Sequence, residues 1–405
     1  MKISRLSLEG FKTIKHQENL EFDQNINLFI GANGSGKSNL LSFFEMMSFM
    51  MTNHFQQYLV ENGFASTLLY FGSKITSQIE AMIVFTFQTG ESRYEFKLSH
   101  IAGDTLVFAQ ESIDDKNHEK PQKITLCGGN KETELEALSL EKQATIAKEI
   151  KSFLSSISIF HFHDTSKNAW LKQARAIEDN AYLKSDAGNL ASFLYCLKEE
   201  YPKHYNKIKL IIRQITPFFD DFVLNPNKND YILLKYKEMG SDMEFGAFRL
   251  SDGVLRFMAL ATLLIQPKEK MPSIMIIDEP ELGLHPVAID KLASLLTSAS
   301  KYSQIFIATQ SERLLNHFEI DNIIVVSREK EMGTGRYFSE FKKLNEEELK
   351  TWLAKYSLSQ QFIKMLILLQ FKTIITTYCR TTLSRSYAPA SLPFALRATI
   401  KDCPT

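Results

Sequence analysis

The chain has 405 residues, which is long enough for a large core and for two or three lobes. Lys plus Arg and Asp plus Glu both number 47, so the formal net charge is zero and any contact with nucleic acid must come from a local patch. The cysteines form no Cys-x-x-Cys pair, the N-terminus lacks an apolar signal core, and no apolar run approaches the ~20 residues of a membrane span, so we expect a reduced cytoplasmic protein without zinc, disulfides or a membrane segment.

The first hundred residues predict strands around one long helix. Residues 1–30 predict two strands, the second of which leads directly into a Gly-rich loop. The apolar run after Asn39 has no helix breaker, which predicts a helix packed on a sheet. Residues 79–88 and 92–99 alternate with period two on either side of a Thr-Gly turn, so they predict an antiparallel hairpin.

The pattern changes in the middle of the chain. Residues 111–123 are charged and contain one Pro, which predicts a surface loop. Two segments, 134–153 and 189–214, have the periodicity of helices, and a short strand at 157–162 lies between them.

Helices and strands alternate again from residue 245. An apolar helix at 254–265 precedes a buried strand at 273–277, and an amphipathic helix at 286–300 follows. Strands at 304–308 and 322–326 complete a βαβ series, which predicts a parallel sheet.

The strongest motif predicts a phosphate-binding loop. It lies between a predicted strand and a predicted helix, and this context disfavours the alternative of a chance Gly-rich turn. Its glycines let backbone amides turn inward around an anion, and the next helix points its N-terminus at the phosphates. Lys37 would reach the β- and γ-phosphates, and the Ser38 hydroxyl would ligate Mg²⁺. The predicted nucleotide-binding residues of this segment are Gly31, Asn33, Gly34, Ser35, Gly36, Lys37, Ser38 and Asn39.

A pair of carboxylates follows the buried strand at 273–277. Ligands of open α/β sheets lie at the carboxyl ends of strands. Asp278 would hold Mg²⁺ through water, and Glu279 would act as a general base on the attacking water. The alternative is an acidic strand end that only faces solvent, and the phosphate loop argues against it.

The sequence Leu250-Ser251-Asp252-Gly253 precedes the apolar helix at 254–265. On local grounds it predicts only an N-cap, in which Ser251 or Asp252 caps the helix. Its position one helix before the Asp-Glu strand favours a second role at the nucleotide.

In this order the phosphate loop, LSDG, IIDEP and the ELGLHP segment at 281–286 resemble the core of an ABC-type ATPase. Among ABC-type ATPases, the opening segment ISRLSLEGFKTI resembles the SMC/RecF-like predicted ATPases of bacteria. That group is placed with the AAA-like and OLD-like ATPases. YFGSK at 70–74, FHFHDTS at 160–166 and IATQS at 307–311 support the resemblance, which covers about residues 1–358.

The resemblance implies a P-loop NTPase of α/β class, with a mixed central sheet, flanking helices and a helical lobe. The implied divisions are the first part of the ATPase core in 1–99, an inserted helical lobe in 100–244, the second part of the core in 245–330 and a C-terminal extension in 331–405.

The resemblance also implies a mechanism that needs two copies of the chain. Two protomers would meet head to tail across two ATP molecules, each with Mg²⁺, as a homodimer or within a higher homo-oligomer. Ser251 and Gly253 of one copy would contact the γ-phosphate held by Lys37 of the other, and 281–286 would form the D-loop that links the two sites.

Two positions depart from the pattern of ABC transporters. Gln310 stands where transporters have a switch histidine; it can hydrogen-bond a γ-phosphate but carries no charge, and we assign it a catalytic role. The place of the Q-loop glutamine is held by His161-Phe162-His163-Asp164. His163 or Asp164 could sense Mg²⁺ and water there, and a histidine that merely caps or packs is the open alternative.

Other residues receive weaker assignments. Lys12 is a candidate nucleotide contact or a solvated surface lysine, Trp170 is assigned to the core, and His285 is assigned to the D-loop turn. After Leu358 the chain leaves the family pattern, so residues 359–405 are either a divergent helix and strand or the product of a changed reading frame.

Three functions remain open. The first is an ATP-driven dimerising switch that acts on DNA with a separate nuclease or other effector, in anti-phage defence or repair, because the sequence shows no nuclease motif of its own. The second is a repair ATPase without a nuclease, for which the basic residues of 203–213 would form the DNA path unless they are a solvated helix face. The third is the nucleotide-binding subunit of a membrane transporter, which Gln310 and the missing Q-loop glutamine argue against.

Overall fold

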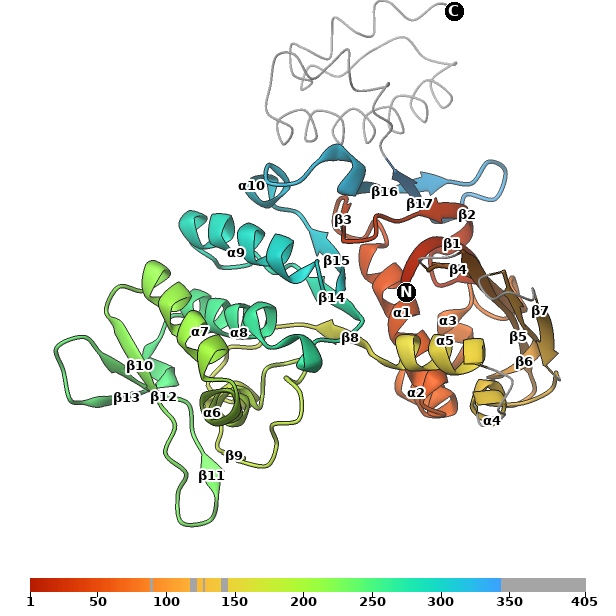
Figure 1. Ribbon diagram of the computed structural model, residues 1–405. Coiled ribbons are helices and arrows are strands. Elements are labelled where there is room, and N and C mark those ends of the chain that lie inside the picture. The colour runs from red at the N-terminus through yellow and green to blue at the C-terminus, as the bar shows by residue number, and fades with distance from the viewer. Residues whose placement is uncertain (88–89, 117–121, 127, 140–144, 344–405) are drawn as a thin grey trace, which may run out of the picture. The chain divides into compact units, whose positions relative to one another are not determined.

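Two six-stranded sheets organise the part of the chain that the structure describes (Figure 1). The structure is a computed structural model, and it describes residues 1–87, 90–116, 122–126, 128–139 and 145–343. These all belong to one unit, Met1–Phe362. The predicted C-terminal extension, 331–405, is described only as far as Lys343. The question of residues 359–405 lies outside the described residues, as do Cys127, Cys379 and Cys403.

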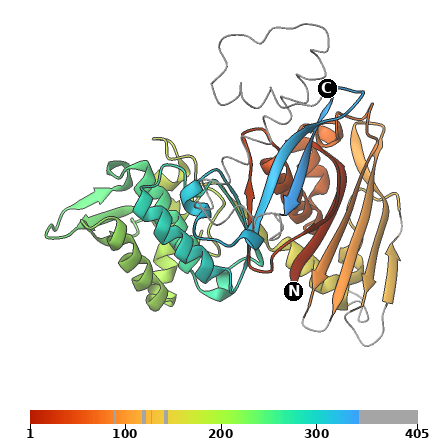
Figure 2. The same cartoon turned by 90° about the horizontal axis from the view of Figure 1, so that it is seen from above.

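The first sheet is antiparallel, with the strand order β2-β1-β4-β5-β6-β7 (Figure 2). Its strands are β1 (Lys2–Phe11), β2 (Ile14–Glu21), β4 (Gln78–Thr86), β5 (Glu91–Ile101), β6 (Thr105–Asp115) and β7 (Gln122–Leu126). The predicted hairpin is confirmed as β4 and β5. The sequence predicted two strands within 1–30, and the structure has three. The additional strand is β2, which exposes most of its polar side chains and shows no apolar run.

The surface loop predicted at 111–123 is wrong for most of its length. β6 continues to Asp115, and β7 begins at Gln122. Two acids of this segment are buried rather than solvated: the Glu111 carboxylate accepts a hydrogen bond from the Tyr94 hydroxyl (2.6 Å), and Asp115 accepts one from Ser92 (2.6 Å). Charge predicted a loop here because the sequence does not show that hydroxyl partners lie across the strand pair.

The second sheet is mixed, with the strand order β17-β16-β3-β15-β14-β8. Its strands are β3 (Ile26–Ile30), β8 (Ile157–Phe160), β14 (Ile274–Asp278), β15 (Gln304–Thr309), β16 (Ile323–Lys330) and β17 (Tyr337–Lys343). All neighbours are parallel except β16 and β17. The predicted parallel series is therefore confirmed, and the carboxyl ends of β3, β15, β14 and β8 lie side by side.

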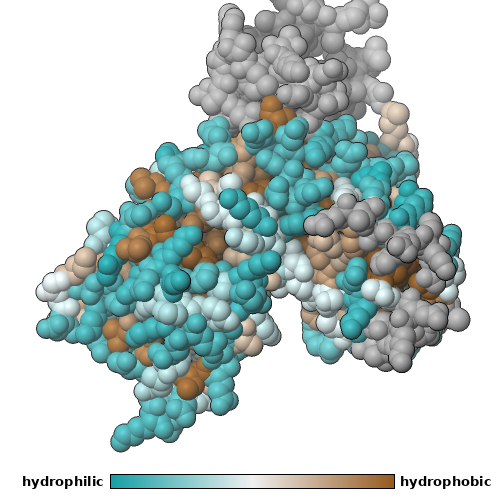
Figure 3. All heavy atoms as spheres, viewed as in Figure 1, coloured by the Kyte–Doolittle hydropathy of each residue, from teal (hydrophilic) through white to brown (hydrophobic). Residues whose placement is uncertain are grey.

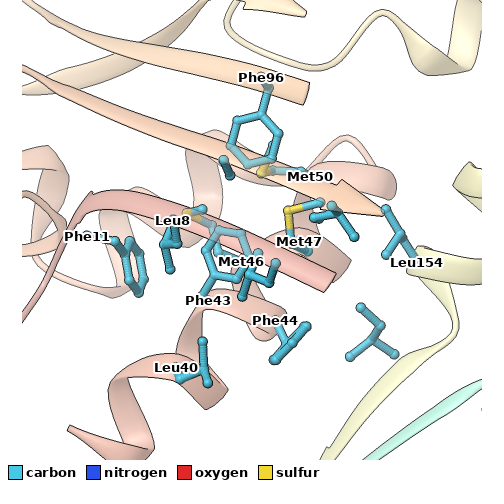
Figure 4. Close-up of a cluster of buried hydrophobic side chains, with 14 of the residues drawn as sticks. Leu8, Phe11, Leu40, Phe43, Phe44, Met46, Met47, Met50, Phe96 and Leu154 are labelled. Atoms are coloured by element: carbon cyan, nitrogen blue, oxygen red, sulfur yellow. The ribbon is translucent and has the colours of Figure 1, made fainter. Parts of the chain in front are cut away.

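Helix α1 (Lys37–Met51) is buried against both sheets, and Figure 4 shows its side chains next to Phe96 of the first sheet. Phe43 stacks on Phe96 of the first sheet, with ring centroids 6.4 Å apart, while Phe44 lies 5.0 Å from Phe306 of the second. Contact on two sides explains why the run after Asn39 is apolar except for Ser42, Glu45 and Ser48, which are partly exposed. The neighbouring short helices are α2 (Phe55–Glu61), α3 (Phe64–Leu68), α4 (Leu135–Ser139) and α5 (Thr145–Ser155), and 140–144 lies outside the described residues.

The other helices group around α8, which packs against α7 and α9. They are α6 (Leu190–Glu200), α7 (Pro202–Ile215), α8 (Asp252–Ile265), α9 (Pro286–Ala299) and α10 (Glu312–Leu315), with single turns η1 (Trp170–Lys172), η2 (Ala247–Arg249), η3 (Lys268–Lys270) and η4 (Ile320–Asn322). Short strands accompany them: β9 (Arg175–Ala176), β10 (Phe219–Val223), β11 (Tyr231–Ile232), β12 (Lys235–Glu238) and β13 (Glu244–Gly246).

The predicted helical lobe at 100–244 therefore contains strands as well as helices. Its first part, β6 and β7, belongs to the same sheet as β1. The boundaries at 99, 244 and 330 stay predictions. Trp170 does not belong to the core: it is 55% exposed, and the Arg175 guanidinium lies over its ring at 4.0 Å. An exposed ring covered by a cation looks the same in sequence as a buried one.

Candidate nucleotide site

The phosphate loop connects β3 to α1, as the sequence predicts. Gly34 and Gly36 have φ angles of 77° and 112°, in the left-handed region that disfavours side chains. A Cβ on Gly36 would also lie 2.0 Å from the Ser339 hydroxyl oxygen. Helix α1 has no capping side chain and no acid in its first turn, so its terminal amides are available to an anion. This backbone fits a nucleotide phosphate.

The Lys37 ammonium group lies across this loop. Its Nζ donates to the carbonyl oxygens of Gly31 (2.7 Å) and Ala32 (3.2 Å). Burial lowers the pKa of Lys37, and the nearby carboxylates of Glu279, Asp278 and Glu281 oppose that shift. A cation held beside the loop amides by neutral carbonyls is well placed to exchange them for a phosphate. Ser38, the predicted Mg²⁺ ligand, is exposed in the first turn of α1.

A small hydroxyl network supports the loop from β17 and from the turn after β1. The Ser339 hydroxyl donates to the Ser35 carbonyl (2.6 Å) and pairs with the Thr13 hydroxyl (2.6 Å). Asn39, predicted to bind nucleotide, uses its amide to donate to Thr13 (2.6 Å). Ser339 comes 304 residues after Ser35, so local sequence gives no signal for this support.

The two predicted catalytic carboxylates leave the end of β14 in different ways. Asp278 is the last residue of the strand, and burial raises the pKa of its carboxyl, against the opposing effect of His161. Glu279 has a φ of 43°, an uncommon conformation for a residue with a side chain, and its amide donates to the Ala308 carbonyl (2.8 Å). Strained backbone of this kind is concentrated at functional sites.

Gln310 connects the separate motifs. Its Nε2 donates to Asn33 of the phosphate loop (2.7 Å) and to the Glu279 carboxylate (2.5 Å). The structure thus brings together three residues that sequence analysis selected from three distant segments. They meet because β3, β14 and β15 are neighbours in the second sheet.

Glu281 is a site residue that sequence analysis did not select individually. Its carboxylate accepts hydrogen bonds from the Thr309 hydroxyl (2.6 Å) and from the Gln310 amide (3.1 Å). Burial raises the pKa of Glu281, and the Thr309 hydrogen bond opposes that shift. The D-loop therefore fixes the backbone that carries Gln310. The only sequence signal for Glu281 was its place in the 281–286 segment.

The Q-loop alternatives separate in the structure. Asp164 is exposed and accepts a hydrogen bond from the Ser166 amide (2.9 Å), so it caps a turn. His163 instead joins His161 and Asp278 in a cluster whose potential ligand atoms all lie within 4.8 Å of one another. Burial lowers the pKa of His161, and the Asp278 charge opposes that shift. Sequence analysis selected His163 but not His161.

The LSDG segment caps α8, as local reading predicts. The Ser251 hydroxyl accepts a hydrogen bond from the Val254 amide (3.4 Å), and Ser251 is exposed. Gly253 packs on the D-loop, where a Cβ would lie 2.3 Å from the Gly283 carbonyl oxygen. Among the described residues, no hydrogen bond or ion pair joins Ser251 or Gly253 to the phosphate loop of the same chain.

Arg256, on α8, holds three segments together. Its guanidinium donates to the carbonyl oxygens of Phe162 (3.0 Å), His163 (2.8 Å) and Leu282 (2.9 Å). It thereby ties helix α8 to the D-loop and to the loop after β8 that carries His161 and His163, here called the histidine loop. The sequence does not indicate this role, because a single Arg in an apolar helix gives no sign of its partners.

We expect Arg256→Ala to destabilise the protein by about 2 kcal/mol, because it removes hydrogen bonds from a charged donor to three carbonyls. Arg256→Lys should recover little of this loss, since one ammonium cannot match the planar fork. Thermal unfolding measures the effect. Arg249→Ala, which removes the same type of side chain just before α8, is the control, and equal melting temperatures for all four proteins would contradict the assignment.

Two further assignments can be compared with the structure. Lys12 is half-buried with a φ of 47°, and burial lowers its pKa, against the effect of Glu45, so it is not a freely solvated lysine. His285 caps α9 through Nδ1, which accepts from the Val287 amide (3.4 Å), and its role in shaping the D-loop turn stays a prediction.

Sequence relatives of this chain include structural maintenance of chromosomes (SMC) proteins. A homolog of SMC protein 3 from Plasmodium falciparum (isolate 3D7) is 25% identical over 221 residues, which cover 52% of this chain and 18% of that protein. SMC protein 3 of Arabidopsis thaliana is 34% identical over 95 residues, covering 23% and 7%. The match therefore spans less than a fifth of the length of these curated relatives.

Solved structures with a similar fold are SMC heads. An SMC head bound to the C-winged helix domain of ScpA has a TM-score of 0.56 at 18% identity and covers 86% of this chain and 100% of that one. An SMC head with an extended coiled coil, bound to the C-terminal domain of ScpA and derived from Pyrococcus furiosus, has a TM-score of 0.53 at 17% identity, covering 86% and 98%. These likenesses show the fold, and they confirm the predicted ABC-ATPase architecture.

A family model matches much more of the chain. The model described as "AAA domain, putative AbiEii toxin, Type IV TA system" matches residues 26–316, a range that contains the phosphate loop, the LSDG segment, the Asp-Glu pair and Gln310. The chain belongs to this AAA-domain family, and it has the fold of the SMC heads.

Proposed function

We propose that the protein is a switch that binds ATP and Mg²⁺ and hydrolyses ATP only when two copies close over the nucleotide. The observation that carries this proposal is the pair of hydrogen bonds from Gln310 to Asn33 and to Glu279. They join the phosphate loop and the carboxyl ends of β14 and β15 into one site, where an attacking water and a γ-phosphate would meet.

Each residue of this site has a definite task. The loop amides and Lys37 bind the phosphates, and Ser38 and Asp278 are the side chains that would hold Mg²⁺, directly and through water. Mg²⁺ would neutralise charge on the phosphate oxygens. Glu279 accepts a proton from the attacking water, and Gln310 orients that water or the γ-phosphate through its amide.

A second copy would supply what one protomer lacks. The N-terminus of α8 is exposed at Ser251, and the described residues show no bond from it to its own phosphate loop. A helix N-terminus attracts an anion, so Ser251 and Gly253 of one copy are suited to the γ-phosphate held by the other. A two-fold arrangement forms this contact twice.

Ser251→Arg tests the second copy. We expect it to keep ATP binding in the monomer and to lose the ATP-dependent dimer, because a long charged side chain would fill the space of the γ-phosphate contact. Light scattering with and without ATP measures the dimer, and equilibrium dialysis measures binding. Ser294→Arg, on the exposed side of α9, is the matched control. An ATP-dependent dimer of Ser251→Arg would remove the LSDG segment from the site.

The wider role we propose is an action at DNA together with a separate effector such as a nuclease, in anti-phage defence or DNA repair. The family description names a putative toxin, and the sequence relatives are SMC proteins. Helix α7 supports a separate DNA-contacting partner: Lys209 pairs with Asp221 (2.7 Å), and Arg213 pairs with Asp220 (2.7 Å), so its basic residues are partly neutralised.

The transporter alternative receives less support. The structural neighbours described above are SMC heads. In the described part of the chain, no helix has the length and apolar character to cross a membrane. The face in Figure 3 is mainly hydrophilic, with apolar areas that are separated from one another.

A further inference from the structure

A cluster of two imidazoles and one carboxylate lies beside the proposed ATP site. The ligand atoms of His161, His163 and Asp278 all lie within 4.8 Å of one another, and His161 Nδ1 is 3.9 Å from Asp278 Oδ2. Bonds of ~2.1 Å to a single ion separate its ligands by ~3 to ~4.2 Å, so small side-chain rotations would bring all three onto one metal.

The sheet register places these residues together. Phe160 of β8 pairs with Ile277 of β14 in parallel, so His161 and Asp278 leave neighbouring strands at the same level. His163 follows two residues later, and its ring lies 6.2 Å from that of His161 with an angle of 33° between their planes. The arrangement therefore follows from the fold and does not depend on one flexible side chain.

The backbone of the histidine loop is anchored on both sides. The His161 amide donates to the Ser185 carbonyl (2.9 Å), and Arg256 holds the carbonyls of Phe162 and His163. Within the described residues, neither imidazole makes a hydrogen bond, and the ring of His161 has Asp278 as its ion-pair partner. A rigid backbone that carries two such rings is a suitable basis for metal ligation.

The donor set does not match what Mg²⁺ prefers. Mg²⁺ is bound through oxygen and keeps several waters, whereas imidazole nitrogen with carboxylate oxygen suits first-row transition metals. We propose that His161, His163 and Asp278 form a site for a transition-metal dication such as Mn²⁺, beside the phosphate loop. Through the shared Asp278 this ion would be positioned next to the nucleotide phosphates.

This metal site deepens the proposed function, and any part it plays in catalysis rests on that function. Binding of the metal itself does not require ATP. The experiment is therefore a titration of nucleotide-free protein with Mn²⁺, followed by electron paramagnetic resonance. We expect bound Mn²⁺ whose pulsed spectrum carries the ¹⁴N modulation of imidazole, and a tenfold excess of Mg²⁺ should not displace it.

The double variant His161→Asn/His163→Asn should lose the ¹⁴N signal and bind Mn²⁺ at least ~10-fold more weakly. His204→Asn is the matched control and should leave the spectrum unchanged, and circular dichroism checks that the double variant folds. Lys37→Ala should keep the ¹⁴N signal although it loses ATP, which separates a failure of this site from a failure of the ATPase proposal. An all-oxygen Mn²⁺ spectrum in the wild type, or equal affinity in the double variant, would overturn the proposal.

Discussion

Glu279→Gln should keep ATP binding, lower turnover by about 10²-fold or more, and accumulate an ATP-bound dimer. The amide has the shape of the carboxylate, and its oxygen can still accept the Gln310 hydrogen bond that is 2.5 Å long in the wild type. It cannot accept the proton of an attacking water. Phosphate release measures turnover, for which we expect on the order of one per second or less in the wild type, and light scattering measures the dimer.

The control for this experiment is Glu269→Gln, an identical exchange at an exposed residue of η3. It should hydrolyse ATP at the wild-type rate. Glu281→Gln would act on the position of Gln310 and not on the base, because the Glu281 carboxylate accepts hydrogen bonds from the Thr309 hydroxyl and from the backbone amide of Gln310. Hydrolysis by Glu279→Gln at the wild-type rate would show that Glu279 is not the base.

The parts of the site that the sequence predicts are those that depend on backbone geometry. The phosphate loop needs glycines at fixed positions, and the Asp-Glu pair needs only a buried strand before it. These are local signals with a physical cause. Gln310, in contrast, was selected through the resemblance to ABC-type ATPases, in which a switch residue follows the next strand.

The parts that the sequence does not predict depend on long-range contacts. Arg256 reaches Phe162 and Leu282 across the fold, and Ser339 supports Ser35 from the far end of the described chain. Neither residue has a neighbour in sequence that reveals its partner. His161 is a similar case, because only the register of β8 with β14 brings it to Asp278.

Whether the sequence predicted a buried strand correctly depended on whether the buried side chains of that strand are apolar. Buried apolar strands such as β14 and β15 are continuous apolar runs, and they are recognised as such. β6 carries acids that hydroxyl groups satisfy inside the sheet, so it resembles a solvated loop. The sequence shows that a charged side chain is unfavourable to bury, but it does not show which hydrogen-bond partner offsets that cost.

Lys37→Ala should weaken ATP binding by about 10- to 150-fold, which corresponds to the loss of hydrogen bonds from one charged donor, ~1.5 to 3 kcal/mol. The ammonium group is already desolvated and satisfied by the carbonyls of Gly31 and Ala32. Removing it should therefore change the melting temperature of the nucleotide-free protein much less than it changes the response to ATP.

Thermal unfolding with and without ATP separates these two effects, because bound ligand stabilises the folded state in proportion to the logarithm of its concentration over Kd. Wild-type protein should gain stability as ATP and Mg²⁺ rise, and Lys37→Ala should need proportionally more ATP for the same gain. Lys301→Ala, at an exposed lysine after α9, is the control and should behave as the wild type. If Lys37→Ala responds to ATP like the control, the phosphates are not bound at this loop, and the composite site built on it fails.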